Sequence, residues 1–165
     1  MPHGSVSESI PAPSQAVFAL LHDYERRLEW DTLLQDARLV DGWATAQLHA
    51  TSICTGRWYL GGLAVKTEYV AFNPPRVAAV KMLNRPAFFA AFAATIRHRD
   101  RSDGTSSVEY TYQFTARPAW LRWLLHPVMS AIFGWETRKR LRALQRFFAR
   151  AETASAARER GQRDG

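Results

Sequence analysis

A strict alternation of apolar and polar residues between Ser106 and Phe114 constrains the fold of this chain more than any other sequence feature. Val108, Tyr110, Tyr112 and Phe114 occupy the even positions, and polar residues occupy the odd positions between them. Successive side chains of a β-strand point to opposite faces, so this pattern predicts a strand with one buried and one solvated face. Such a strand belongs to an antiparallel sheet whose inner face is covered by another element.

The residues before this strand supply further strands. Short apolar runs are separated by typical turn sequences, such as Asp41-Gly42 and Asn73-Pro74-Pro75. A strand is also expected at the start of the chain, before Pro11. The predicted strands span residues 6–10, 36–40, 47–54, 63–72, 76–83, 86–98 and 106–114.

The segment 86–98 is ambiguous by sequence. Phe88, Phe92 and Ile96 stand four residues apart, a spacing that suits a helix face and also one face of a strand. Its five alanines and leading proline favour a helix. The turn at residues 99–105, which leads directly into the strong strand, favours a hairpin, and we predict a strand.

Helices are predicted at both ends of the strand-rich region. Ser14 is placed to cap a first helix with Val17 and Phe18 on its apolar side, and residues 24–30 form a second, highly charged one. After Pro118 the spacing of apolar residues predicts one long helix. Pro127 either kinks this helix or marks where a preliminary turn ends and the main helix begins. Beyond residue 150 the apolar stripe is lost, so we expect a single domain over residues 1–150 and a basic, disordered tail over residues 151–165.

Composition narrows the class of protein. The chain has 165 residues, 47% of them hydrophobic, which fits one soluble domain. With Cys54 as the single cysteine, no intrachain disulfide or multi-cysteine zinc site can form. Residues 1–9 lack a secretory signal, and the longest apolar run, residues 119–135, is short and interrupted for a membrane span. We therefore expect a cytoplasmic protein.

The net charge of +7 is concentrated near the C-terminus. From Glu136 to Gly165 nine Arg or Lys residues stand against four acids, which leaves +2 for residues 1–135. Leu141, Leu144 and Phe148 interleave the cations at helical spacing, as in a packed helix with a solvated basic face. Since no base-reading motif is present, we expect no nucleic-acid partner, and only a weak contact of this helix with an anionic membrane surface.

The order of elements resembles the helix-grip fold. The opening Ile10-Pro11-Ala12-Pro13, followed by the apolar first helix, Asp23 and Trp30, is similar to the start of the superfamily of START proteins, polyketide cyclases and birch-pollen-allergen-like proteins (SRPBCC). The resemblance covers residues 6–150 and implies an α+β helix-grip fold. In it, a curved antiparallel sheet of about seven strands wraps around a long C-terminal helix, with two short helices between the first two strands.

The resemblance also implies a cavity between sheet and helix that binds a hydrophobic small molecule, such as a lipid, a quinone or a polyketide-like aromatic. Carried over to the matching positions of this sequence, the resemblance implies eight residues for this ligand-binding cavity. They are Trp30, Tyr69, Phe88, Phe92, Tyr110, Tyr112, Met129 and Phe133.

Catalytic and metal-binding signals are absent from the sequence. The five histidines have no ligand-like spacing, and there is no nucleophile elbow, dinucleotide fingerprint or phosphate loop. We therefore predict no metal, no cofactor and no identifiable catalytic residue. His98 is the one candidate for an inward-facing titratable group. Two alternatives to a binding protein stay open: a cyclase, aromatase or dehydratase that uses the same cavity, and a module that acts through its C-terminal helix.

Overall fold

The computed structural model describes residues 2–163, except for the side chains of residue 60 and residues 155–163. It contains seven strands, two short helices after the first strand and one long helix at the end, in the predicted order. Two 3-10 turns precede β4 and α3. The elements are β1 (His3–Ile10), α1 (Ser14–His22), α2 (Arg27–Trp30), β2 (Leu34–Val40), β3 (Thr51–Gly56), η1 (Trp58–Leu60), β4 (Ala64–Asn73), β5 (Val77–Met82), β6 (Phe89–Asp100), β7 (Ser106–Ala116), η2 (Ala119–Leu121) and α3 (Arg122–Arg163).

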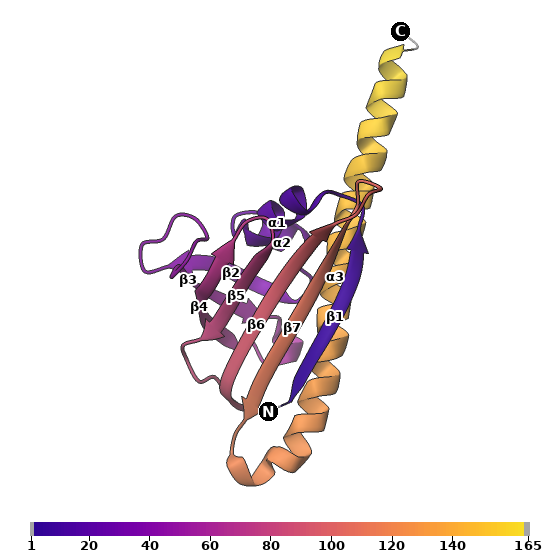
Figure 1. The fold of residues 1–165 in the computed structure, drawn as a ribbon. Helices are drawn as coiled ribbons and strands as arrows, with labels where there is room; N and C mark the ends of the chain where they lie inside the picture. Colours follow the sequence, from indigo (N-terminus) through magenta and orange to yellow (C-terminus); the bar gives the residue numbers. More distant parts are fainter. Residues whose placement is uncertain (1, 164–165) are drawn as a thin grey trace.

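The strands form one antiparallel sheet in the order β1-β7-β6-β5-β4-β3-β2. This sheet curls, and α3 packs against β1 and β7. Figure 1 shows α1 and α2 at one end of the sheet and the start of α3 at the other. Because β5, β6 and β7 are antiparallel neighbours, β5 and β7 both finish at the end where α3 begins. The helix-grip fold expected from the sequence is confirmed.

The ambiguous segment 86–98 is a strand, as predicted. β6 pairs with β7 from Phe89 opposite Ala116 to Asp100 opposite Ser106, with an irregularity between Phe89 and Ala91. Because of this irregularity, the buried aromatic residue at the start of the strand is Phe89. Phe88 lies just before the strand at a φ of 65° and is 53% exposed.

The N-terminus of α1 is capped differently from the sequence expectation. Ser14 is the first residue of the helix and not its cap. The Asp100 carboxylate at the end of β6 accepts hydrogen bonds from the backbone N–H of Ser14 at 2.6 Å and from its hydroxyl at 2.8 Å. A negative charge at a helix N-terminus is favourable, because the free N–H groups there carry partial positive charge. This pair attaches α1 to the sheet.

The long helix α3 has two parts with different surroundings. Leu141 and Leu144 are fully buried in the core, against a cluster that includes Val6, Ile10 and Val17. The half before them carries Pro127 inside the helix, and its apolar residues Met129 and Phe133 pack against the core while partly buried. None of the helices within residues 2–163 has the length and apolar character needed to cross a membrane.

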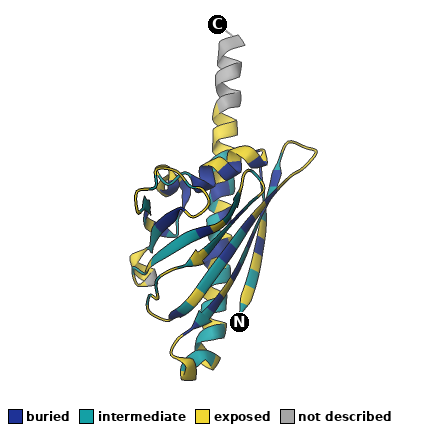
Figure 2. Cartoon of the chain, turned by 60° about the vertical axis from the view of Figure 1, so that its left-hand side comes forward, coloured by how far each residue is buried: buried dark blue, intermediate teal, exposed yellow. Residues whose placement is uncertain are grey.

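The helix continues to Arg163, whereas the sequence predicts a disordered tail after residue 150. Figure 1 shows this last part projecting beyond the body of the molecule, and Figure 2 shows exposed residues on α3 where it leaves the body. The alanines, glutamates and arginines of this segment favour helix, and extending an existing helix costs far less than starting one. Loss of the apolar stripe therefore ends the packing but not the helix. Residues 164–165 lie outside the described residues, and the domain boundary at residue 150 stays a prediction.

Candidate functional site

A cavity of about 510 Å³ lies between the first half of α3 and the inner face of the sheet. Its walls come mainly from β3 to β6, from α1 and α2, and from α3. Ala78 and Ala94 are buried in the centre of the sheet and face this space. Their small side chains leave room that a Val or Leu would fill, so the cavity follows from the choice of residues as well as from the curvature of the sheet.

Six of the eight residues that the sequence assigns to the cavity line it. They are Tyr69, Phe88, Phe92, Tyr110, Met129 and Phe133.

Trp30 and Tyr112 are not among the cavity-lining residues. Trp30 is buried beneath Arg27 and Arg140, whose guanidinium carbons lie 5.1 and 5.8 Å from the centre of its ring. The ring of Tyr112 covers Gly4, where an added Cβ would lie only 2.5 Å from the ring. Both aromatic residues belong to the packed core, and the ligand-binding role of the other six stays a prediction.

A buried ion cluster forms one part of the cavity wall. Asp31 is 1% exposed, and its Oδ2 accepts a hydrogen bond from Arg27 Nε at 2.9 Å and forms an ion pair with Arg140 Nε at 2.8 Å. Arg27 also donates to the backbone carbonyl of Leu21. Burial lowers the pKa of Arg27, but the Asp31 carboxylate together with smaller contributions from Cys54, Tyr24 and Tyr69 outweighs this effect, so the net shift of the pKa is upward. Two permanent positive charges therefore sit at the cavity around one carboxylate.

A chain of hydroxyl groups forms a second polar part of the wall. The Tyr69 hydroxyl lies 2.8 Å from His22 Nδ1 and 3.1 Å from the Tyr24 hydroxyl, which donates to Ser52 at 2.9 Å. Burial lowers the pKa of His22 well below its ordinary value and raises that of Tyr69 well above it. At neutral pH both groups are uncharged, and they can relay a proton or orient a polar ligand atom.

Glu136 is the third polar group of the cavity. It is 4% exposed, and within the described part of the chain neither carboxylate oxygen has a hydrogen-bond partner. The closest cation is Lys139, whose Nζ lies 3.8 Å from Oε1. Burial raises the pKa of Glu136, and the nearby negative charge of Asp31 raises it further, against the opposing effect of Lys139. An unpaired buried carboxyl is costly, so this site is suited to a ligand that supplies the missing hydrogen bond.

Sequence reasoning missed these charged residues. The signal that could have found them is an interruption of the apolar stripe on α3. Ile132, Glu136, Arg140 and Leu144 stand four apart and therefore share one helix face. A carboxylate and a guanidinium between two inward-facing apolar residues must also face inward. The Arg27 and Asp31 pair has the same i,i+4 relation but lies in a segment so rich in charge that nothing marks it as buried.

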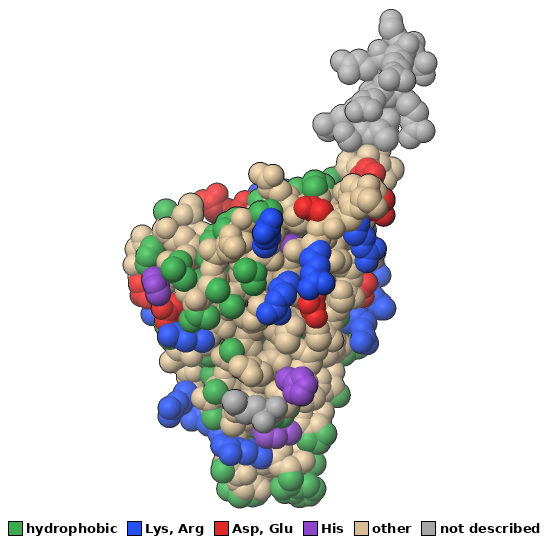
Figure 3. All heavy atoms as spheres, viewed as in Figure 1, with side chains coloured by type: hydrophobic (Ala, Val, Ile, Leu, Met, Phe, Trp, Pro, Cys, Tyr) green, Lys and Arg blue, Asp and Glu red, His purple; other side chains and the backbone are tan. Residues whose placement is uncertain are grey.

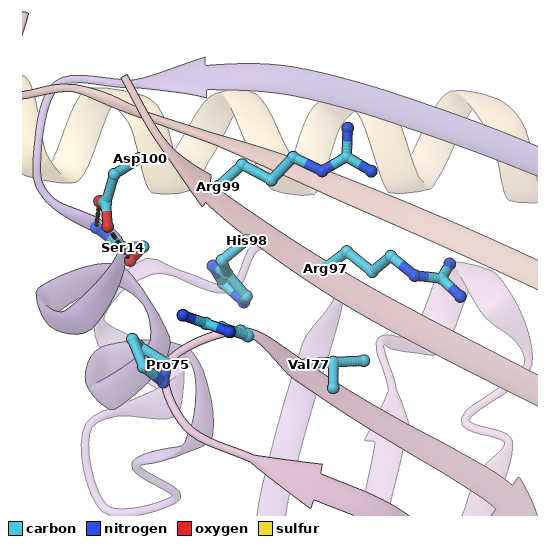
Figure 4. A pocket seen from close by; sticks show the side chains of 8 residues that line it. Ser14, Pro75, Val77, Arg97, His98, Arg99 and Asp100 are labelled. Carbon is cyan, nitrogen blue, oxygen red and sulfur yellow. Dashed lines mark hydrogen bonds between the residues drawn. The ribbon is translucent and has the colours of Figure 1, made fainter. Parts of the chain in front are cut away.

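His98 does not line this cavity, contrary to its selection from the sequence. It is buried against Phe18, with the ring centres 5.2 Å apart. It lines a separate surface groove of about 550 Å³, which Figure 4 shows between Ser14 and Asp100 on one side and Pro75 and Val77 on the other. The irregularity between Phe89 and Ala91 lies at the start of β6, so it does not change which face of the strand His98 occupies. The curl of the sheet instead directs this end of the strand toward α1.

Burial of His98 predicts a loss of stability in mild acid. Burial lowers its pKa from 6.5 to about 4. The unfolded chain therefore binds more protons between these values, so stability is complete above pH 6.5 and falls as the pH drops toward 4. Substitution His98→Phe should lower the slope of the unfolding free energy in this window by up to about 1.4 kcal/mol per pH unit. Urea unfolding at a series of pH values measures this slope.

The control for this experiment is His3→Gln, since His3 is exposed. It should leave the slope unchanged. His22 contributes in the same direction, because its pKa is also lowered, so some slope should remain in the His98 variant. An unaltered slope in His98→Phe would contradict the prediction.

The geometry of the described residues supports neither a metal site nor a cysteine nucleophile. Among residues 2–163, no group of three or more His, Cys, Asp or Glu side chains is placed to hold a metal ion. Cys54 lines the cavity, but burial raises the pKa of its thiol to about 11. The thiol is therefore protonated at neutral pH, and only the thiolate is a strong nucleophile.

Comparison with known proteins identifies relatives of this fold. Residues 1–148 match the model of a family described as polyketide cyclase / dehydrase and lipid transport. The comparison with curated proteins found no match.

Among solved structures, the Zhui aromatase/cyclase from Streptomyces sp. R1128 has a TM-score of 0.78 and 13% identity, over 90% of this chain and 94% of that one. The protein XoxI from Bacillus cereus has a TM-score of 0.74 and 19% identity, over 92% and 99%. A START superfamily protein from Mycobacterium smegmatis has a TM-score of 0.72 and 10% identity, over 90% and 98%. At these identities the structures show a shared fold, and the family match covers nearly the whole chain. The chain therefore belongs to the polyketide cyclase / dehydrase and lipid transport family, within the START-like superfamily expected from its sequence.

Proposed function

We propose that this protein binds a hydrophobic small molecule that carries a polar group, and that it does so in the cavity between α3 and the sheet. The observation that carries the proposal is the cavity itself, about 510 Å³ in volume and lined mainly by aliphatic and aromatic side chains. This volume lies in the range of small-molecule sites, which combine apolar walls with a few polar groups. A lipid, a quinone and a polyketide-like aromatic molecule all have this character.

The polar groups restrict the ligand further. Glu136 needs a hydrogen-bond partner, whereas Arg27 and Arg140 supply positive charge next to it. A hydroxyl group, which both donates and accepts hydrogen bonds, satisfies this wall better than a purely hydrocarbon molecule. We therefore expect an alcohol or a phenol to bind more tightly than the matching hydrocarbon.

Filling the cavity should abolish binding. Ala94→Phe places a ring in the centre of the cavity, so we expect the affinity for N-phenyl-1-naphthylamine, a dye that fluoresces in apolar surroundings, to fall at least about tenfold. Fluorescence titration measures this change. Ala93→Phe is the matched control, because its side chain points to the other face of the same strand. Equal affinity of both variants, or no saturable binding by the wild type, would overturn the proposal.

A second candidate is an enzyme of the cyclase, aromatase or dehydratase type. The observation that favours it is the presence at one cavity of a carboxyl with a raised pKa, Glu136, and a neutral His22–Tyr69 pair. These groups can exchange protons with a bound molecule, while the cavity walls hold its reacting atoms together. Incubation with a poly-β-ketone tests this role. The enzyme role is supported if the wild type forms product and Glu136→Gln forms none but still binds the dye. It is contradicted if the wild type forms no product.

Contact of the basic part of α3 with an anionic membrane surface stays a proposal. The structure reduces the number of free cations on this segment. Arg140 is buried with Asp31, Arg142 lies 3.4 Å from Glu8, and Lys139 sits over the ring of Trp135 at 4.9 Å. Charge reversal of Arg138 and Arg146, which are outside these contacts, should remove this binding if it occurs.

A further inference from the structure

The end of the molecule where β5 and β7 finish carries large apolar side chains that face solvent. Trp120 and Trp123 are 75% and 77% exposed. Large aromatic rings are usually buried, and a group of them on one surface marks a contact site. We call this surface the apolar tip, and it consists of Phe88, Trp120, Trp123, Leu124 and Val128.

These residues come from two connections that the sheet topology places together. Phe88 lies between β5 and β6, and the others lie between β7 and the middle of α3. The backbone N–H of Arg117 donates to the Phe88 carbonyl at 2.9 Å, and the Arg117 guanidinium donates to the Arg85 carbonyl at 2.8 Å. The two connections are therefore joined directly.

The two connections of the tip carry only positive charge. Residues 83–92 and 116–135 contain three arginines, Arg85, Arg117 and Arg122, and no aspartate or glutamate. None of the three arginines forms an ion pair with a residue in the described part of the chain. Figure 3 shows apolar side chains at the lower end of the molecule and acidic side chains only in the upper half of the same face.

The mouth of the cavity extends along α3 to this tip. Four of the cavity-lining residues are exposed, and they locate the mouth: Tyr59, Phe88, Val128 and Ile132. Phe88 and Val128 belong to the apolar tip as well. The exposed aromatic residues of the tip therefore lie beside one end of the entrance.

The charge distribution selects the partner. A second copy of this chain docked tip to tip would bring six uncompensated arginines together, because the two connections of each tip have three and no acid. An anionic bilayer accepts both features, since tryptophan favours the membrane interface and arginine favours acidic headgroups. We propose that the apolar tip inserts into the interface of a bilayer that contains anionic phospholipid, with Arg85, Arg117 and Arg122 at the level of the headgroups and the cavity mouth against the lipid.

Vesicle sedimentation with the full chain tests the proposal. The probes are vesicles of phosphatidylcholine alone and vesicles in which about one third of the lipid is phosphatidylglycerol. We expect binding to the second kind, and a loss of at least about tenfold in the double variant Trp120→Ala/Trp123→Ala. Arg85→Glu/Arg117→Glu should lose binding to the anionic vesicles as well. Tryptophan emission should shift to the blue when the wild type binds.

Two controls keep the test specific. Leu48→Ala removes an apolar side chain that is also about half exposed, at 47%, but lies in the connection at the opposite end of the sheet, and it should bind as the wild type does. Arg138→Glu/Arg146→Glu separates the tip from the basic part of α3. The proposal is overturned if the tryptophan variants bind vesicles normally, or if the wild type fails to bind and is instead a dimer that these variants dissociate.

The result is independent of ligand binding in solution. The tryptophan variants leave the inner cavity wall unchanged, so they should bind N-phenyl-1-naphthylamine with wild-type affinity. Loss of vesicle binding with dye binding retained supports the docking site. If the wild type binds neither the dye nor the vesicles, the first result contradicts the proposed function and the second contradicts the docking site.

Discussion

The substitution Asp31→Asn is expected to lower the free energy of unfolding by about 3 to 5 kcal/mol, the usual cost of breaking a buried ion pair. Asp31 is the carboxylate that Arg27 and Arg140 share, and all three side chains are largely shielded from water. The asparagine preserves the shape and can still accept the hydrogen bond that the Leu33 N–H donates at 3.2 Å. It removes the charge, so two buried guanidinium groups are left without a counterion. Urea unfolding of both proteins measures the difference.

Two further variants make this prediction decisive. Glu29→Gln removes a carboxylate whose partner, Arg26, is exposed, and it should change stability little. The triple variant Arg27→Met/Asp31→Leu/Arg140→Met removes all three charges together and should recover most of the loss, since the cost comes from charges left unpaired. A loss in Asp31→Asn no larger than in Glu29→Gln would show that the cluster does not stabilise the fold.

The substitution Leu144→Ala is expected to cost about 3 to 5 kcal/mol of unfolding free energy, because Leu144 is fully buried where α3 packs on the core. Removing its side chain loses the transfer free energy of the missing atoms and leaves a void among Val6, Ile10 and Leu141. The matched control is Ile132→Ala, three turns earlier on the same helix face. Ile132 is 46% exposed at the cavity mouth, so its removal creates no new void and should cost less than about 1 kcal/mol.

The comparison of these two variants also tests the cavity. Equal losses at Leu144 and Ile132 would mean that the first half of α3 is packed as tightly as the second. A large difference would show that the helix is anchored by its second half, with the first half closing the cavity. Thermal unfolding with and without N-phenyl-1-naphthylamine should then show a larger rise in Tm for the wild type than for Ala94→Phe.

Much of the fold could be predicted from local patterns. The alternation at Val108, Tyr110, Tyr112 and Phe114 identifies a half-buried strand, because successive side chains of a strand point to opposite faces. All four residues are buried in the structure. The ambiguity of residues 86–98 also has a physical origin, since a spacing of four is compatible with both periods. The adjoining turn resolved it.

The candidate site was predicted only in its apolar part. Tyr69, Tyr110 and Phe92 face the cavity because alternation specifies which side of a strand a residue occupies. Trp30 and Tyr112 have the same apolar character but fill the core, since their distance from the empty space depends on how far the sheet curls. Phe88 was assigned by the phase of a regular strand, and the irregularity at Phe89 moved it to the rim.

The charged residues of the site required the tertiary structure. Arg27, Asp31 and Arg140 come from α2, the residue after it and α3, and Glu136 lies one turn before Arg140. Charged residues on a helix are usually solvated, so the sequence favours a surface position for each. Their burial depends on α2 and α3 facing each other across the cavity, which no local pattern records.

The sequence by itself therefore determined the strands, the long helix, the helix-grip order and the inner face of the sheet, because these follow from backbone periodicity and short-range turns. Only the tertiary structure decided the volume of the cavity, the charges inside it and the tryptophans and arginines gathered at its mouth. The physical reason is that cavity volume, burial of charge and surface patches depend on distances between segments far apart in the chain. Periodicity specifies the direction of a side chain but not what stands opposite it.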